Sequence, residues 1–239
     1  MNVCLNNEMT IVSIRQPGYL PYMGFFKKIQ SCDVFVFLDD VQFSKNSYIN
    51  RVQIKNNDNV KWLTAPVKSS FGLSINNIAF SQDDWPNRHL SSLYGSYAKS
   101  KAFNEVWPDI QEIYNSIDTS QLLSFSNIKI IKKVAKLLEI ECDLLLSSEI
   151  DSRGNGDDRL ISIVSEISKS ATYVSGSGGS KYQDPGKFFD SGLGFEYIKF
   201  SHPSYLQSGE KFQPGLSIID AIFQLGWVEV SNIIRKSII

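Results

Sequence analysis

IVSIRQPGYLPYMGFFKKIQSCDVFVFLDD, residues 11–40, is the stretch that decides the fold. Thr10–Arg15 is a short β-branched run that ends at Gln16-Pro17-Gly18, which predicts a buried strand followed by a turn. Pro21–Ser31 suits a helix with a proline in its first turn. Asp33–Leu38 is a second apolar strand, and two aspartates close it. A strand, a helix and a strand in this order begin a right-handed parallel crossover.

The remainder of the chain resumes this alternation after an insertion. Residues 45–82 predict a β-hairpin excursion, with strands at Ser47–Lys55 and Val60–Val67 around an Asn/Asp turn and a third strand at Leu73–Phe80. Residues 85–139 predict a helical block. Its three helices are expected at Pro86–Lys99, Phe103–Ile117 and Ser120–Leu138. Further strands are expected at Cys142–Leu146, Thr172–Val174 and Phe195–Phe200, and further helices at Asp157–Ser168, within Gly178–Asp190, at Leu216–Leu225 and at Glu229–Lys236.

The pattern as a whole predicts one α/β domain over residues 1–239. We expect a doubly wound, mostly parallel Rossmann-like sheet, interrupted by the hairpin and the helical block. In such sheets ligands bind beyond the carboxyl ends of the strands, so the polar residues that follow each strand are the first candidates for a site.

The composition is that of an ordinary globular protein. Of 239 residues, 42% are hydrophobic and 21% are charged, and the formal net charge is −1, which gives no support for a nucleic acid partner. No apolar run approaches the roughly 18 residues of a membrane span, and residues 1–10 lack the features of a secretory signal. The three cysteines show no CxxC spacing, so neither a disulfide framework nor a metal site is expected, and we predict a cytoplasmic protein.

The loop after the first strand is the first candidate site, and its candidate substrate-binding residues are Gln16, Tyr19 and Tyr22. The loop leads into a helix N-terminus, which favours a phosphate or carboxylate. The GxGxxG fingerprint is absent, which disfavours a standard dinucleotide site. The alternative is a stiff proline turn with two tyrosines packed over the sheet edge.

Two carboxylates and an arginine follow the second strand. Asp39 and Asp40, with Gln42, could bind a sugar hydroxyl, hold a divalent metal or act as a base, and the alternative is a strand-end turn. Arg51, beside Asn50, could clamp a phosphate or carboxylate with two hydrogen bonds. The alternative for Arg51 is an exposed position on the hairpin.

A glycine-rich loop and a histidine follow later strands. Successive backbone N–H groups in the loop could cradle an anion, although the Walker A spacing is absent, and the alternative is a flexible linker. The candidate binding residues there are Ser175, Gly176, Gly178, Gly179 and Tyr182. His202 could move a proton near neutral pH, or it could cap the turn before Pro203. The other histidine, His89, lies in a helical pattern, and we interpret it as structural.

Five segments in order, QPGYLPYMGFF, FLDDVQFSKNSYINRVQIK, KWLTAPV, TYVSGSGGSKY and SHPSYLQ, resemble the WbqC-like protein family from about Ile11 to Trp227. Members are found with bacterial O-antigen and other surface-polysaccharide genes. One departure is Ser47-Tyr48, where a bulkier aromatic such as Trp is expected beside Asn50. The family pattern falls on Gln16, Pro17, Tyr22, Asp39, Asp40, Gln42, Asn50, Arg51, Ser175, Gly176, Gly179, Tyr182, His202 and Pro203.

A second likeness concerns the opening of the chain. A strand, then RQPGYLP, then a helix is similar to the start of HIGH-type nucleotidylyltransferases, where RFQPFHxGH fills this place. Both histidines of that motif are missing here, since Leu20 or Tyr22, and Gly24, stand in the region. The likeness implies a shared fold and disfavours adenylyl transfer.

The leading hypothesis is a transferase of O-antigen biosynthesis that moves an acyl or aminoacyl group to an amino sugar on a nucleotide carrier. An acyl carrier protein is a candidate donor, and no tightly bound cofactor is expected. His202 would take a proton, Asp39 or Asp40 would orient the sugar, and Arg51 with the 175–179 loop would hold phosphate. The alternatives are nucleotidyl transfer or adenylate-forming ligation with ATP and a divalent metal, and a non-catalytic binding protein of a glycan assembly complex.

Overall fold

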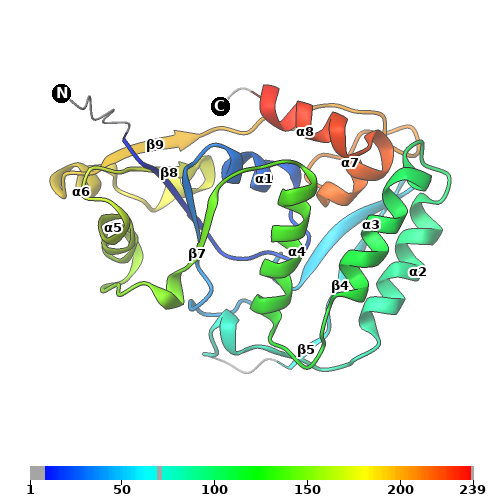
Figure 1. Ribbon diagram of the computed structural model, residues 1–239, viewed down its shortest axis with the longest axis horizontal. Coiled ribbons are helices and arrows are strands. Elements are labelled where there is room, and N and C mark those ends of the chain that lie inside the picture. The colour runs from blue at the N-terminus through cyan, green and yellow to red at the C-terminus, as the bar shows by residue number, and fades with distance from the viewer. Residues whose placement is uncertain (1–8, 69–71, 238–239) are drawn as a thin grey trace, which may run out of the picture.

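A five-stranded parallel sheet forms the centre of the computed structural model, which describes residues 9–68 and 72–237 (Figure 1). Every neighbouring pair of strands in this sheet is parallel. In chain order the arrangement is 3-2-1-4-5, with β1 at the centre. The predicted α/β fold with a Rossmann-like sheet is therefore confirmed. In spatial order the strands are β7 (Asp143–Leu146), β2 (Val34–Phe37), β1 (Ile11–Arg15), β8 (Thr172–Gly176) and β9 (Gly194–Ile198).

Strand β2 shows why this sheet needs cover on both faces. All four of its residues are buried, and successive side chains of a strand point to opposite faces. Phe35 and Phe37 join the larger hydrophobic core on one face, whereas Val34 and Val36 join a smaller core on the other. A strand that is apolar on both sides is typical of parallel sheets between helices.

The helices divide between the two faces (Figure 1). The face of Phe35 is covered by α1 (Met23–Gln30), α4 (Leu123–Leu137), α7 (Ile218–Leu225) and α8 (Trp227–Lys236). The opposite face is covered by α5 (Gly156–Ile167) and α6 (Pro185–Asp190). Connections from the central strands thus leave to both faces, which makes the sheet doubly wound. None of the helices in the described ranges combines the length and apolarity that crossing a bilayer requires.

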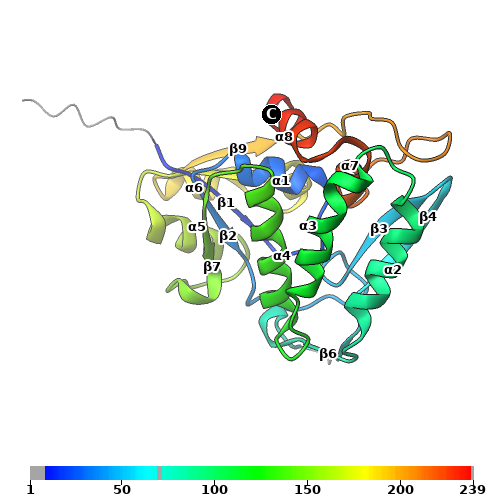
Figure 2. The same cartoon turned by 45° about the vertical axis from the view of Figure 1, so that its right-hand side comes forward.

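Ahead of α4, the insertion between β2 and β7 contains a hairpin and two further helices. Strands β3 (Arg51–Asn56) and β4 (Asn59–Thr64) pair antiparallel, followed by α2 (Trp85–Tyr97) and α3 (Phe103–Asn115). Figure 2 shows these elements on the far side of α4 from α5. The insertion therefore enlarges the molecule on the side of the larger core.

The third strand predicted for the hairpin excursion, Leu73–Phe80, is wrong. Only β6 (Ala79–Phe80) is extended there, paired with β5 (Val67–Lys68), and a 3₁₀ turn, η1 (Ile75–Asn77), precedes it. Ser74 Oγ donates to Asn76 Oδ1 and accepts from Asn77 Nδ2, both at 2.7 Å. Such local bonds compete with a strand ladder.

The first helix begins later than predicted. It starts at Met23 rather than at Pro21, with Tyr22 as its N-cap. Leu20 has a φ of 41°, a left-handed conformation that keeps it outside the helix. The carbonyl of Pro21 accepts a hydrogen bond from Ile218 N at 3.0 Å. Contacts with the distant α7 therefore hold these residues in a loop.

Replacing Phe37 by alanine should destabilise the fold strongly. Phe37 is fully buried, and its ring centre lies 5.2 Å from that of Phe35. We expect Phe37→Ala to lower the free energy of unfolding by about 3–5 kcal/mol, measured by urea denaturation. The matched control is Phe189→Ala, because Phe189 is 58% exposed, and its cost should stay within about 0.5 kcal/mol. Equal losses in the two variants would contradict the assignment of Phe37 to the core.

Candidate functional site

The strand order reverses between β1 and β8, and this reversal marks the crevice where doubly wound sheets bind ligands. The loop after β1 leads to α1 on one face, whereas the loop after β8 leads to α6 on the other. The two loops therefore separate at the carboxyl edge of the sheet. Both contain residues that the sequence predicts to bind substrate.

The loop after β1 is held by distant segments rather than by its own residues. Tyr19 N donates to Tyr48 O at 3.0 Å, and Ser217 Oγ donates to Leu20 O at 2.8 Å. Tyr19 itself is buried, and its hydroxyl lies 2.8 Å from His89 Nδ1. The structure thus places Tyr19 in the core and Gln16 half-buried near the strand end.

His89 belongs to the same buried network. Its Nε2 lies 3.2 Å from Thr64 O, and the Tyr19 hydroxyl also lies 2.7 Å from the Tyr114 hydroxyl. Burial lowers the pKa of His89 to about 4, so the ring is neutral at pH 7. These contacts agree with the structural interpretation of His89.

Tyr22 links the first loop to the segment that carries His202. The centre of its ring lies 5.5 Å from that of the His202 ring and 5.7 Å from the guanidinium carbon of Arg15. The approach depends on Gly24, because a Cβ there would lie 2.4 Å from the Tyr22 ring and 2.6 Å from that of Phe200. The structure therefore brings Tyr22 and His202 together.

Arg15 is a residue that the sequence reasoning missed. It is exposed at the carboxyl end of β1, and Nη1 lies 3.9 Å from the position of a Cβ built on Gly176, which ends β8. Within the described residues it forms no ion pair. The sequence pattern that could have identified Arg15 is a charged residue at the end of an apolar strand, immediately before Gln-Pro-Gly.

The amine of a buried lysine, Lys28, lies behind the end of β1. Lys28 is 5% exposed, and its Nζ donates to Ile14 O at 3.1 Å. Burial and the positive charge of Arg15 lower the pKa of Lys28 to about 7. The end of β1 therefore carries the full positive charge of Arg15 and only part of a charge on Lys28, and this charge favours an anion.

The glycine-rich loop is packed close to the end of β8. Ser175 Oγ donates to Gln183 Oε1 at 2.6 Å, and a Cβ on Gly179 would lie 2.1 Å from that oxygen. The loop continues as a 3₁₀ turn, η3 (Ser177–Lys181), so it is an ordered turn. Gly178 has open space around it, and Tyr182 is 78% exposed.

The two carboxylates lie at the same edge, by the ends of β2 and β7. Asp39 is buried, and its carboxylate accepts hydrogen bonds from Ser148 N at 3.1 Å and Ser148 Oγ at 2.8 Å. Ser147 Oγ donates to Asp40 Oδ1 at 2.6 Å. The sequence reasoning missed Ser147 and Ser148. They form a polar pair directly after the apolar strand β7, and this pattern could have identified them. Both carboxylates thus already accept hydrogen bonds from the protein itself.

Arg159, on α5, forms an ion pair with Asp40. Burial raises the pKa of Asp40, but the hydrogen bonds from Ser147 and Arg159 outweigh it, and the net pKa is lowered. Asp40 is therefore ionised at neutral pH and is held between Ser147, which follows β7, and Arg159 on α5. The described residues contain no group of three or more His, Cys, Asp or Glu arranged to hold a metal ion.

Arg51 is the first residue of β3 and belongs to the hairpin, which is separate from the parallel sheet. Its guanidinium carbon lies 4.1 Å from the centre of the Trp62 ring, a cation–π contact. Asn50 is buried, and its side-chain amide donates to Ala65 O at 3.1 Å. Gln42 is exposed and forms an isolated bridge with Ser74. Asn50 thus fixes the entry into β3, and Arg51 follows it.

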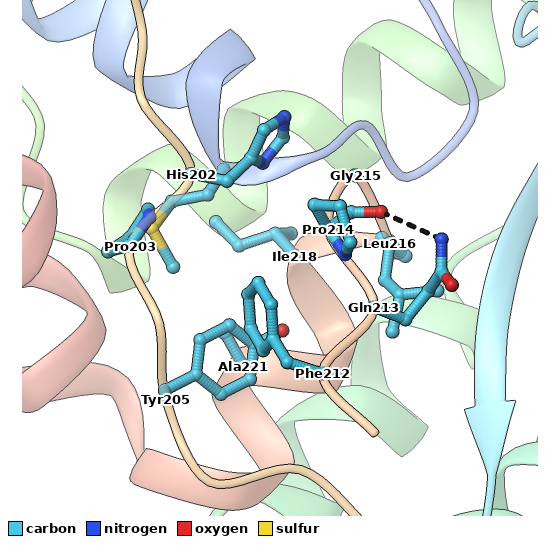
Figure 3. Close-up of a pocket in the computed structure, with 12 residues that line it drawn as sticks. His202, Pro203, Tyr205, Phe212, Gln213, Pro214, Gly215, Leu216, Ile218 and Ala221 are labelled. Carbon is cyan, nitrogen blue, oxygen red and sulfur yellow. Dashed lines mark hydrogen bonds between the residues drawn. The ribbon is translucent and has the colours of Figure 1, made fainter. Parts of the chain in front are cut away.

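His202 lies at the rim of a small cavity of about 20 Å³ (Figure 3). In the close-up, the rings of Tyr205 and Phe212 lie together on the opposite side, with centres 5.7 Å apart. The cavity has room for about one water molecule. Burial lowers the pKa of His202, so the ring is neutral at pH 7 and can accept a proton.

Comparison with known proteins relates the chain to one family. The model of the WbqC-like protein family matches residues 16–232. A relative, the uncharacterized protein Rv1507c of Mycobacterium tuberculosis, is 27% identical over 221 residues, which cover 91% of this chain and 95% of that protein. The family match spans both loops at the strand reversal and the segment that carries His202.

Removing Arg159 should destabilise the edge around Asp40 in a pH-dependent way. The two side chains are 21% and 24% exposed, and we expect Arg159→Ala to cost about 1–2 kcal/mol at pH 7. Because the folded pKa of Asp40 is lowered, its contribution is present above the unfolded pKa and is lost as pH falls through the folded pKa. The difference between the two proteins should therefore shrink in acid, as urea denaturation at several pH values would show.

The matched control is Lys187→Ala. It removes an ion pair with Asp158 whose side chains are 51% and 64% exposed, and such pairs contribute roughly 0–1 kcal/mol. If Arg159→Ala costs no more than Lys187→Ala at pH 7, the Arg159–Asp40 pair does not stabilise this edge.

Proposed function

The chain belongs to the WbqC-like protein family, and we propose that it is a transferase that acylates or aminoacylates a nucleotide-linked amino sugar for surface polysaccharide. The observation that carries the proposal is Arg15, an exposed arginine at the strand reversal without an ion-pair partner in the described residues. An arginine in this position suits a phosphate, which its planar guanidinium can bind through two hydrogen bonds.

The diphosphate of a nucleotide sugar fits the surroundings of Arg15. Lys28, which is partly protonated at pH 7, adds to the positive charge from behind the strand. Gly176 lets a ligand approach the backbone beside the guanidinium, because no side chain stands there. The exposed ring of Tyr182, after the glycine-rich loop, offers an apolar surface for the base or the sugar.

His202 is the proposed base. The ring of Tyr22 separates the His202 ring from the guanidinium of Arg15. A sugar attached to a phosphate at Arg15 can therefore extend toward the imidazole. The amine nitrogen attacks the carbonyl carbon of a thioester on an acyl carrier. The N–C bond forms and the C–S bond breaks, and His202 takes a proton from the amine and gives it to the leaving thiolate.

The remaining predicted residues are assigned to binding and positioning. Asp39 and Asp40 hold the loops after β2 and β7 through Ser147 and Ser148, and in the proposal this edge orients the sugar. Arg51 provides a further cation for the donor. In the proposal Tyr19 and Asn50 support the site from buried positions, while Gln16, Gln42, Ser175, Gly178 and Gly179 line or shape the loops.

A second candidate is nucleotidyl transfer or adenylate-forming ligation. The parallel order 3-2-1-4-5 favours it, because nucleotides bind at such strand reversals. Tyr22 and Gly24 in place of the motif histidines disfavour it. Binding of ATP with Mg²⁺ in place of a nucleotide sugar would make this candidate the better one.

Arg15→Gln should weaken the binding of nucleotide sugars. We expect nucleoside-diphosphate amino sugars to raise the melting temperature of the native chain, with ATP and Mg²⁺ tested alongside. Hydrogen bonds to charged groups contribute about 1.5–3 kcal/mol, so Arg15→Gln should raise Kd roughly tenfold to a hundredfold, measured by calorimetry.

Arg88→Gln removes the same charge from an exposed position on α2 and is the matched control. It should leave Kd unchanged. If no nucleotide sugar binds, or if both variants bind equally well, Arg15 does not hold a phosphate and the proposal fails.

His202→Gln should lower kcat by about 10²–10⁴-fold on an acyl acceptor that binds. The pKa of His202 is lowered by burial, so the base form is present at pH 7 and is lost as pH falls through that pKa. The wild-type rate should fall on the acid side, and this limb should disappear in His202→Gln, measured from kcat against pH. Persistence of the limb with an unchanged kcat would assign the proton transfer to another group.

A further inference from the structure

A groove lies at the amino edge of the sheet, opposite to the candidate site, and contains two thiols. Its volume is about 530 Å³. It is formed by residues around the start of β1, the end of α1 and the start of β7. Cys32 precedes β2 and Cys142 precedes β7, which are neighbouring strands. Nothing in the proposed transferase reaction uses this groove.

The two sulfur atoms are close and differently accessible. The distance between Cys32 Sγ and Cys142 Sγ is 3.8 Å, and both cysteines are free. Cys32 is 6% exposed, and its sulfur also lies 3.3 Å from Lys28 O and from Ile29 O. Cys142 is partly exposed in the groove. A disulfide needs a separation of about 2.05 Å, so the sulfurs must approach by roughly 1.8 Å.

We propose that Cys32 and Cys142 form a redox pair, in which a hydroperoxide oxidises Cys142 and Cys32 closes an intramolecular disulfide. In the first step the Cys142 thiolate attacks a peroxide oxygen. The S–O bond forms, the O–O bond breaks, and hydroxide leaves and takes up a proton. In the second step Cys32 attacks the Cys142 sulfur of the sulfenic acid. The S–S bond forms, the S–O bond breaks, and water leaves with the Cys32 proton.

The surroundings of the thiols assign these roles. Cys142 is the more exposed of the two, and the contact with Cys32 lowers the pKa of Cys142 despite its burial, whereas the contact with Cys142 and burial raise the pKa of Cys32. Cys142 is thus the accessible attacking thiol and Cys32 the resolving thiol. Asp33, Glu141 and Asp143 also line the groove. Their negative charges favour a neutral oxidant such as hydrogen peroxide over an anionic disulfide.

The test uses the full chain carrying Cys4→Ser, which retains only the two thiols of interest. After treatment with hydrogen peroxide, we expect both thiols to disappear from a thiol assay. Peptide mapping without reductant should show Cys32 joined to Cys142. Dithiothreitol should restore both thiols, because a disulfide is reversible and a sulfinic acid is not.

Two further variants separate the attacking thiol from the resolving one. In the same background, Cys32→Ser should leave a sulfenic acid on Cys142 that reacts with dimedone, and Cys142→Ser should leave Cys32 reduced. Oxidation of Cys142 to sulfinic acid while Cys32 is present, or resistance of both thiols to peroxide, would overturn the proposal. Mapping of the oxidised wild-type chain gives the same answer if a variant fails to fold, and a link from Cys4 instead would also overturn it.

Discussion

Residues 17–21 of the loop that follows β1 are buried, and their backbone polar groups need partners that the loop cannot supply. Buried N–H and C=O groups without hydrogen bonds are costly. Asn127 of α4 donates to Pro17 O at 3.0 Å and to Ile49 O at 2.8 Å. Tyr48 and Ser217 satisfy Tyr19 N and Leu20 O. One irregular segment therefore fixes the positions of the helical block, the hairpin and the C-terminal helices.

This requirement also explains how distant parts of the chain reach the candidate site. The C-terminal segment crosses α1 because Gly24 leaves room for the rings of Tyr22 and Phe200. The ring of His202 is then set against Tyr22, at the edge where Arg15 ends β1. The sheet supplies the cation, and a segment nearly two hundred residues later supplies the histidine. Loops placed on a rigid sheet in this manner are where binding groups usually lie.

The sequence predicted those features that depend on local pattern. Runs such as Val34–Phe37 are apolar on both faces, and this identified the buried parallel strands. The pattern did not reveal which carboxylates are already bonded. Asp39 and Asp40 sit at a strand end as expected, but their partners Ser147 and Ser148 lie more than a hundred residues away. Arg15 was counted as a strand residue, since only the order of the strands shows that it stands at the reversal.

The parallel arrangement gives the two edges of the sheet opposite electrostatic character. Helix N-termini and strand carboxyl ends share one edge, where partial positive charge adds to that of Arg15. Cys32 lies at the other edge, just beyond the C-terminal end of α1, where partial negative charge opposes a thiolate. An ionised sulfur at that edge therefore needs a donor, and the Cys32 thiol can provide one to Cys142 at 3.8 Å. The edge that favours phosphate and the edge that holds the thiols are thus suited to different chemistry by the direction of the same strands and helices.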